Sequence, residues 1–264
     1  MPERERSIRV EAVVLKHSNW GEADRLLVLF TRERGKARAI AKGVRKMHSR
    51  KAGHLEPFTR VTLQMSQGRD LWIITQAETV ESYPNIRENL IRTAYASYVM
   101  ELAERFTYEE GASLPLYQLI HETLKRVDSD ADANLAVRYY EIHLLDLVGF
   151  RPQLIHCVSC RTEIMPQDQF FDAGMGGVLC PDCGVKTNTS RPVSMQALKF
   201  IRHLQRSTYK NASRAQIPPE IQREIEALLQ WYITYLLERG LNSPGFLQKV
   251  RRQETGSGEN ITFQ

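Results

Sequence analysis

The four cysteines of this chain form two pairs with the same internal spacing. Two residues separate the members of each pair and 19 residues separate the pairs, which are Cys157 with Cys160 and Cys180 with Cys183. One tight turn can present both sulfurs of a pair to one ion, and two such turns supply the four soft ligands of a closed tetrahedral site. The spacing therefore predicts a structural site for one Zn²⁺ per chain, with no open coordination position for catalysis.

Two disulfides, a redox dithiol or an iron site are the alternatives for these cysteines. The first ten residues are charged, with no apolar run behind them, so we expect no signal peptide and a reducing cytoplasm in which disulfides are rare. His156 is adjacent to Cys157 and is expected to be a bystander. In the second pair, Pro181 is expected to set the turn and Gly184 to adopt the positive φ that directs N–H groups at sulfur.

The 264 residues allow two domains besides the metal module, and the hydrophobic content of 42% is ordinary for a globular protein. No stretch approaches the roughly 18 apolar residues of a membrane span, so we expect no membrane association. Residues 253–264 contain Gly-Ser-Gly followed by a sequence that resembles an altered protease site. We expect a disordered tail there, either natural or introduced by cloning.

Positive charge is concentrated near the N-terminus. Residues 1–80 contain 16 Lys or Arg against nine Asp or Glu, which gives +7 and leaves −2 for the rest of a chain whose net charge is +5. The densest run holds one acid, Glu33, and nine bases: Arg32, Arg34, Lys36, Arg38, Lys42, Arg45, Lys46, Arg50 and Lys51. A solubilising loop would also be charged, but a run embedded in strands favours a phosphate-binding surface.

Before residue 82 the sequence alternates short β-rich runs with turn signals. The expected strands are Arg9–Lys16, Asp24–Thr31, Lys36–Lys42, Val61–Ser66 and Leu71–Glu78. Five strands in about 80 residues fit a closed Greek-key barrel of the OB type, whose exposed face often binds oligonucleotides, and an SH3-like barrel is the alternative. Along the third strand Lys36, Arg38, Ile40 and Lys42 share one face, while Ala37, Ala39 and Ala41 share the other. We expect the alanines inside the barrel and the bases in solvent.

After residue 83 the apolar pattern becomes helical. Core-facing stripes recur through residues 90–106 and 221–236, and two further helices are expected at 114–127 and 134–148. Gly149 and Gly240 are the expected stops, and Ser194 is the expected N-cap of another helix. The cysteines lie between helical segments, so the metal module is expected to be an insertion.

The predicted fold class is α+β and multidomain. An N-terminal five-stranded OB-fold barrel occupies residues 1–81, and an α-helical domain is formed by residues 82–152 and 190–252. The four-cysteine zinc module, residues 153–189, is inserted in that helical domain, and residues 253–264 form the tail.

Several motifs occur in an order that is specific. They are Asn-Trp-Gly-Glu-Ala-Asp-Arg-Leu-Leu-Val-Leu-Phe-Thr at 19–31, Gly-Lys at 35–36, Ala-Lys-Gly-Val-Arg at 41–45, Ser49, Leu-Glu-Pro-Phe at 55–58, Gln-Ala-Glu at 76–78 and Leu-Val-Gly-Phe-Arg-Pro at 147–152. With these motifs the chain resembles the RecO family of bacterial recombination mediators over nearly its whole length, apart from the tail.

The resemblance implies a DNA-repair protein of the cytoplasm and nucleoid that is not an enzyme. Members bind single- and double-stranded DNA, anneal complementary strands, associate with RecR, and engage the C-terminal tail of the single-stranded-DNA-binding protein SSB so that RecA can load. The DNA surface would include Arg38 and Lys42, then Lys36, Arg45, Lys46, Arg50 and Lys51. Trp20 would either stack on a base or pack on the barrel end. Arg126 and Arg138 are candidates for the SSB tail in the helical domain.

Two other classes of function remain alternatives: a zinc-ribbon transcription or RNA-binding adaptor, and a purely structural scaffold. An adaptor would carry its bases on the ribbon, yet Arg161 is the single base between Cys157 and Cys183. The sequence also lacks the P-loop, H-E-x-x-H and G-x-S-x-G motifs, so no enzyme signature supports catalysis.

Overall fold

The computed structural model describes residues 7–256, except residues 110, 131 and 239. Its contacts divide the chain into two compact units, Met1–Ala133 with Asn242–Gln264, and Asn134–Leu241. The sequence predicted a domain boundary after residue 81. In the structure the helices that follow the barrel cluster with it in the first unit, so the division between the units lies elsewhere. Each unit is described by itself.

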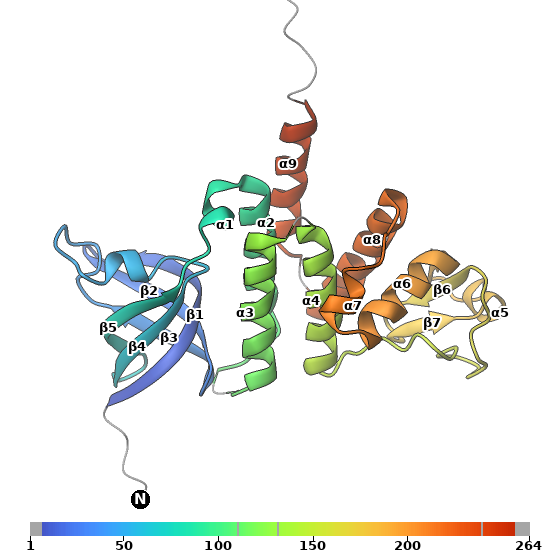
Figure 1. The fold of residues 1–264 in the computed structure, drawn as a ribbon. Helices are drawn as coiled ribbons and strands as arrows, with labels where there is room; N and C mark the ends of the chain where they lie inside the picture. Colours follow the sequence, from blue (N-terminus) through green and yellow to red (C-terminus); the bar gives the residue numbers. More distant parts are fainter. Residues whose placement is uncertain (1–6, 110, 131, 239, 257–264) are drawn as a thin grey trace, which may run out of the picture. The chain divides into compact units, whose positions relative to one another are not determined.

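Five strands form a closed barrel in the first unit (Figure 1). They are β1 Ser7–Trp20, β2 Asp24–Thr31, β3 Gly35–Ala41, β4 Arg60–Gln67 and β5 Trp72–Glu81. Their order is β1-β2-β3-β5-β4, with β4 pairing back onto β1, and β3 with β5 is the parallel pair. The predicted five-stranded barrel of the OB type is confirmed.

The alternation along β3 is also the predicted one. Ala39 and Ala41 are fully buried and Ala37 is nearly so, while Arg38 is exposed. Small side chains on this strand leave room for the larger residues of β1, β2 and β4 that fill the interior, such as Leu27 and Leu63. The strand ends at Ala41, one residue earlier than expected, so the exposed Lys42 begins the following turn.

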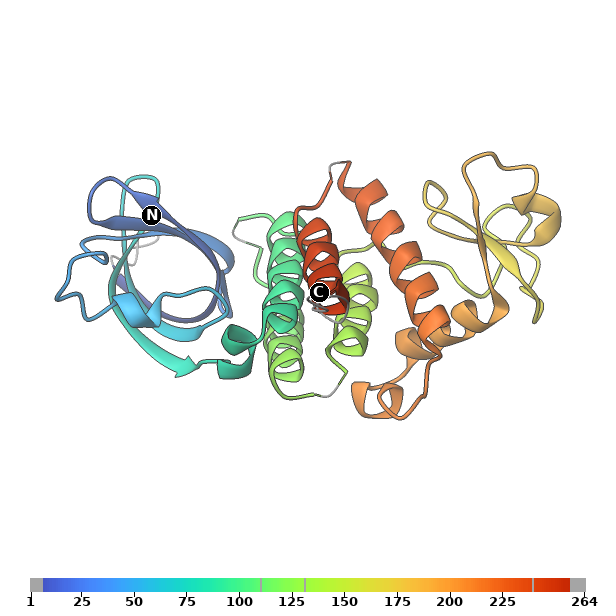
Figure 2. The same cartoon turned by 90° about the horizontal axis from the view of Figure 1, so that it is seen from above.

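In the described part of the barrel's unit there are four α-helices: α1 Pro84–Glu88, α2 Leu90–Arg105, α3 Leu114–Ser129 and α9 Ser243–Gly256. The last helix returns to pack along α2, as Figure 2 shows. The Glu101 carboxylate of α2 anchors it by accepting hydrogen bonds from the backbone N–H groups of Asn242 and Ser243, each at 2.8 Å. The tail was expected to be disordered from residue 253. This expectation is wrong for residues 253–256, which belong to α9. Residues 257–264 lie outside the described residues.

The second unit holds nearly all of α4 Ala133–Leu147, together with α6 Met195–Arg206, α7 Tyr209–Ala212 and α8 Pro219–Leu237. Ser194 caps α6 as expected, because its Oγ accepts from the N–H of Ala197 at 3.1 Å. The expected stop of α8 at Gly240 is wrong. The helix ends at Leu237, followed by Glu238 in the left-handed conformation with φ 51°.

The cysteine segment lies between α4 and α6. It contains β6 Gln169–Asp172, β7 Gly177–Leu179, the short helix α5 Pro181–Gly184 and β8 Arg191–Val193, and its sheet has the order β7-β6-β8. Because β8 pairs with β6, this segment extends four residues beyond the expected end at 189. We call residues 153–193 the cysteine module.

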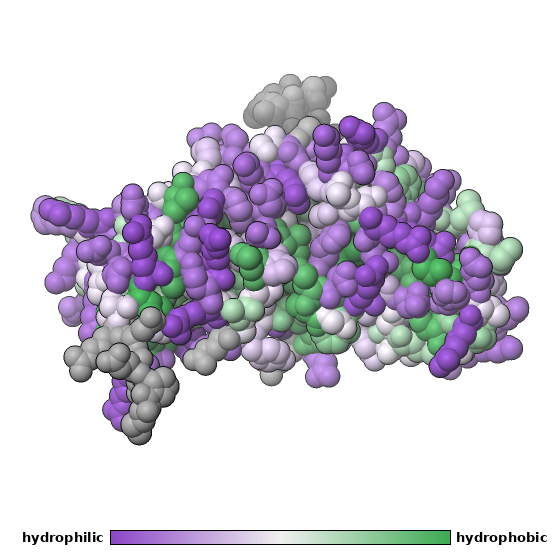
Figure 3. All heavy atoms as spheres, turned by 60° about the horizontal axis from the view of Figure 1, so that its bottom comes forward, coloured by the Kyte–Doolittle hydropathy of each residue, from purple (hydrophilic) through white to green (hydrophobic). Residues whose placement is uncertain are grey.

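Among the residues that the structure describes, no helix combines the length and apolarity needed to cross a bilayer. On the face drawn in Figure 3, hydrophilic side chains predominate and hydrophobic ones are scattered among them.

Candidate metal centre and nucleic-acid surface

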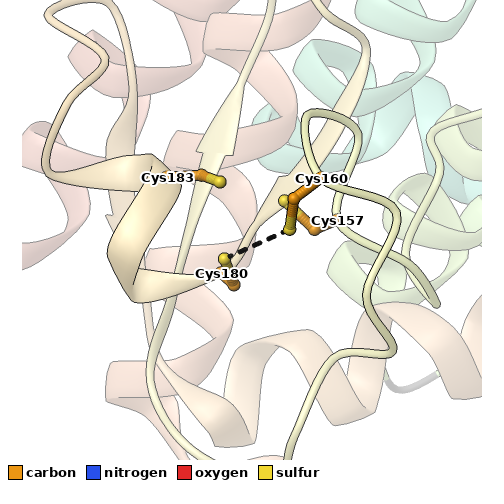
Figure 4. Close-up of side chains that lie close together, drawn as sticks. All are labelled: Cys157, Cys160, Cys180 and Cys183. Atoms are coloured by element: carbon orange, nitrogen blue, oxygen red, sulfur yellow. Dashed lines mark hydrogen bonds between the residues drawn. The ribbon is translucent and has the colours of Figure 1, made fainter.

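The four cysteine sulfurs converge on one point of the cysteine module (Figure 4). All four Sγ atoms lie within 4.8 Å of one another, and 3.7 Å separates those of Cys160 and Cys180. A tetrahedral zinc site with Zn–S bonds of about 2.3 Å has sulfurs roughly 3.8 Å apart. The thiols are free, at distances far from a disulfide bond. The group can therefore hold one metal ion, and it forms without the exposed His156.

The two cysteine turns use different backbone devices. In the first, Arg161 adopts a left-handed φ of 64°, and its N–H donates to the carbonyl of Cys157 at 2.9 Å. In the second, the N–H of Gly184 donates to the carbonyl of Cys180 at 2.8 Å within helical backbone. The expected positive φ at Gly184 is wrong. This glycine is needed for space instead, because a Cβ there would lie 2.3 Å from the ring of Phe170.

Hydrogen bonds from a neighbouring residue stabilise the thiolate form of Cys160. The Thr162 hydroxyl lies 3.0 Å from the Sγ of Cys160. Hydrogen bonds from the side chain and the backbone of Thr162 lower the pKa of the Cys160 thiol to about 6. A hydrogen bond from Ser159 lowers the pKa of the Cys183 thiol, but the contacts with Cys180, Cys160 and Cys157 outweigh it and raise that pKa to about 12. Within the cluster, Cys160 is therefore the thiol that more readily adopts the thiolate form, which is the form that binds metals.

The barrel presents exposed cations along β3 and in the turn that follows. We call Arg38, Lys42, Arg45, Lys46 and Arg50 the basic row, and all five side chains are exposed. The turn is held against the β1–β2 connection, because the N–H of Arg45 donates to the carbonyl of Ala23 at 2.9 Å and its guanidinium donates to that of Gly21 at 3.2 Å. Trp20, at the end of β1, is 58% exposed, so it does not pack into the barrel end.

The remaining two predicted bases are engaged by backbone carbonyls. The ammonium of Lys36 donates to the carbonyls of Glu104, at 2.8 Å, and Thr107. The ammonium of Lys51 donates to the carbonyls of Ile74 at 3.0 Å and Lys42 at 3.2 Å. Burial lowers the pKa of both amines. Lys51 therefore holds the turn after β3 to β5 within the barrel. Lys36 attaches the barrel to the end of α2 in its own unit.

Comparisons with known proteins fit this arrangement. A family model described as Recombination protein O N terminal matches residues 6–83, and one described as Recombination protein O C terminal matches residues 87–244. The chain belongs to the RecO family.

Relatives of this RecO-family chain include proteins named DNA repair protein RecO from three bacteria. That of Roseiflexus sp. (strain RS-1) is 37% identical over 94% of this chain and 88% of the relative. That of Dehalococcoides mccartyi (strain ATCC BAA-2266 / KCTC 15142 / 195) is 36% identical over 88% and 91%, and that of Symbiobacterium thermophilum is 35% identical over 92% and 97%. Membership of the RecO family supports a role in recombination repair.

The two arginines chosen for a RecO-type SSB-tail site are occupied by other contacts. Arg138 is 3% exposed and pairs with the buried Glu141 at 2.9 Å, so it cannot meet a carboxylate from solution. Arg126 lies 3.7 Å from Glu122 on its own helix.

A recess on α6 was missed by the sequence analysis. We call it the α6 recess; it has a volume of about 570 Å³ and is lined by Lys199, Phe200, Arg202, His203, Arg206, Ala215 and Gln216. The spacing of its four basic residues, i, i+3, i+4 and i+7 after the N-cap Ser194, is the signal that could have found it.

Proposed function

We propose that this RecO-family chain is a recombination mediator that binds single- and double-stranded DNA without strong sequence preference and anneals complementary strands. The observation that carries the proposal is the basic row: five exposed cations on one strand and turn of an OB-type barrel. Backbone phosphates are what such a row can neutralise, and counterions released from them drive binding regardless of sequence.

Annealing needs no nucleophile. Two strands of like charge repel each other, and a cationic surface lowers that cost while leaving the base edges free to pair. Contacts confined to phosphates fulfil this condition. We therefore propose that the protein cleaves no bond and acts by charge and by partner binding.

We infer that the cysteine centre holds one structural Zn²⁺. Residues Cys157, Cys160, Cys180 and Cys183 would supply four thiolates and close the coordination sphere. The ion would link the loop after α4 to the turn that starts α5. The exposed Arg161 is the single base between the first and last cysteine, which argues against the module as a phosphate-binding or RNA-reading ribbon.

The remaining partners would be RecR, the SSB tail and, indirectly, the RecA filament. An acidic, partly apolar tail needs an apolar contact with cations beside it. The α6 recess offers this combination, because the half-buried Phe200 lies among Lys199 and Arg206, both exposed. We propose the α6 recess as the SSB-tail site in place of Arg126 and Arg138.

An annealing assay with SSB-coated complementary strands tests this function. The full chain should accelerate duplex formation on strands of unrelated sequence, and free SSB-tail peptide should compete with that acceleration. Failure to bind single strands of any sequence would leave the scaffold alternative, while binding restricted to one RNA sequence would favour the adaptor. Lys199→Glu with Arg206→Glu should abolish the effect of the peptide but preserve annealing of naked strands.

A further inference from the structure

A second recess lies on the barrel, next to Arg38. We call it the barrel recess; its volume is about 440 Å³, within the range of roughly 300 to 1,000 Å³ typical of ligand sites. Three segments border it: the turn between β2 and β3, the turn between β4 and β5, and the connection between α2 and α3. All belong to the same compact unit.

The barrel recess combines a stacking surface with cations. Trp72 and Arg34 both line it, and the guanidinium carbon of Arg34 lies 5.5 Å from the centroid of the Trp72 ring. Arg38 and the exposed Arg69 border the same space. Aromatic rings and guanidinium planes are the two side-chain surfaces on which unpaired bases stack.

Three acids also line the recess, Glu33, Asp70 and Glu109, and one of them is weakly paired with Arg38. Glu109 lies 4.0 Å from Arg38, and both side chains are about half exposed, so solvent screens their attraction. A phosphate can therefore replace this carboxylate beside Arg38 at little cost. Arg38 thus belongs both to the basic row and to the mouth of the barrel recess.

We propose that the barrel recess receives one unstacked base of a single strand whose phosphates lie on the basic row. The inference rests on the proposed function and deepens it, because it assigns a basis for preferring single strands. A duplex keeps its bases stacked and paired, and extruding one costs a few kcal/mol. The base stacks on the Arg34–Trp72 pair, with Arg38 and Arg69 on its flanking phosphates. Stacking is tolerant of sequence, so no base preference follows.

The test compares two strands of equal charge: a thymidine oligonucleotide and a fully abasic oligonucleotide of the same length. The full-length protein should bind the thymidine strand about fivefold to a hundredfold more tightly, as one stacked base allows. Arg34→Ser should reduce that ratio toward one. Arg32→Ser is the matched control, since Arg32 is exposed in the same turn but does not line the recess. It should lower the affinity for both strands and leave the ratio unchanged.

Trp72→Leu removes the ring itself and should have the same effect on the ratio as Arg34→Ser. Trp72 packs against the barrel core, so a melting curve should establish whether Trp72→Leu folds. If Trp72→Leu does not fold, the result with Arg34→Ser decides the test. Equal losses for the thymidine and abasic strands in Arg34→Ser would overturn the recess as a base site while leaving DNA binding intact. Absence of binding to either strand by the wild-type protein would instead overturn the proposed function.

Discussion

The barrel and the cysteine module differ in what can stabilise their folds. The barrel closes its sheet around a cluster of 14 buried residues, so it is stabilised by apolar burial. The module has strands of three or four residues and an open sheet, and a segment of its size buries too little to be stable alone. Four convergent sulfurs could supply the missing constraint by holding one metal ion.

The same difference explains where the charge lies. Because the barrel's interior is complete, its outer surface can carry the self-repelling basic row, which a phosphate backbone would neutralise. As metal-bound thiolates the module's four cysteines would add negative charge, and between its first and last cysteine it has a single base. One region is thus suited to nucleic acid and the other to structural support.

Removing a sulfur ligand should have the largest effect. Cys157→Ser and Cys180→Ser should each lose the tightly bound zinc, because a structural ion contributes roughly 10 to 16 kcal/mol in small finger peptides. The loss should unfold the module and leave the barrel's own core folded. Zinc content by atomic absorption, followed by hydrogen exchange along the chain, measures both effects.

Full retention of exchange protection in metal-free protein would contradict the structural role of the centre. The matched control is Lys186→Ala, which changes an exposed side chain three residues after Cys183 without removing a sulfur. Zinc content should be unchanged in that variant. Single-strand binding should persist in Cys157→Ser if the barrel supplies the DNA surface.

Reversing charge on the barrel should have the second largest effect. The double change Arg38→Glu with Lys42→Glu should weaken single-strand binding on the order of a hundredfold at low salt, about equally for all sequences, and reduce the salt slope by at least about one unit per lost phosphate contact. Annealing of naked strands should fail. Folding should survive, because both side chains are exposed. Titrations at several salt concentrations measure the slope.

Glu22→Lys and Glu78→Lys are the control variants, since both acids are exposed on the barrel but lie outside the basic row. They should not weaken binding. An unchanged salt slope and full annealing in the double mutant would exclude β3 as the DNA surface. The assignment would then move to Arg45, Lys46 and Arg50 in the following turn.

Local spacing explains what could be predicted from the sequence. The bounds of β2 were predicted as observed, because its eight residues form a β-rich run that is flanked on both sides by turn residues. The cysteine cluster was predictable for the same reason, since each cysteine pair lies within one turn. The strands β6, β7 and β8 are too short to carry a readable period, and they depend on pairing and on the sulfur cluster.

Side-chain partners distant in the sequence could not be predicted. Lys36 looked like a phosphate ligand, but its carbonyl partners are 68 and 71 residues away. Arg138 was a candidate for the SSB tail, yet the packing of α4 buries it against Glu141. The barrel recess is likewise formed by three separate segments, so no single stretch of sequence indicates it.

A methyl group at Gly184 tests how tightly the module is packed. Gly184→Ala would place a Cβ 2.3 Å from the Phe170 ring, so the ring or the α5 turn must shift. We expect a loss of about 1 to 3 kcal/mol, as is typical of overpacking, and faster zinc release to a chelator. Gly53→Ala is the control on the barrel side, because nothing lies within 4 Å of its Cβ. Equal behaviour of the two variants would contradict the packing argument.

Acidification should destabilise the two regions at different pH values, with a smaller effect than the substitutions above. Partial burial raises the pKa of the Glu11 carboxyl, but hydrogen bonds from Arg60 and Tyr117, each 2.7 Å from its Oε1, outweigh this and lower the pKa overall. A lowered folded-state pKa contributes stability above the unfolded value of about 4.3, and that stability is lost as pH falls through the folded value. The barrel should thus resist acid until below about pH 4.

The module should respond first, because protonation of its thiolates releases the metal at a higher pH. Glu11→Gln should destabilise the barrel by about 1 to 2 kcal/mol at pH 7 and flatten its loss below pH 4, whereas Glu78→Gln, at an exposed position on β5, should do neither. Chemical denaturation at pH 7 and pH 3.5, followed by far-UV circular dichroism, measures these differences. Metal release and barrel unfolding at one common pH would show that the barrel depends on the ion as well, and the contrast between the two regions would fail.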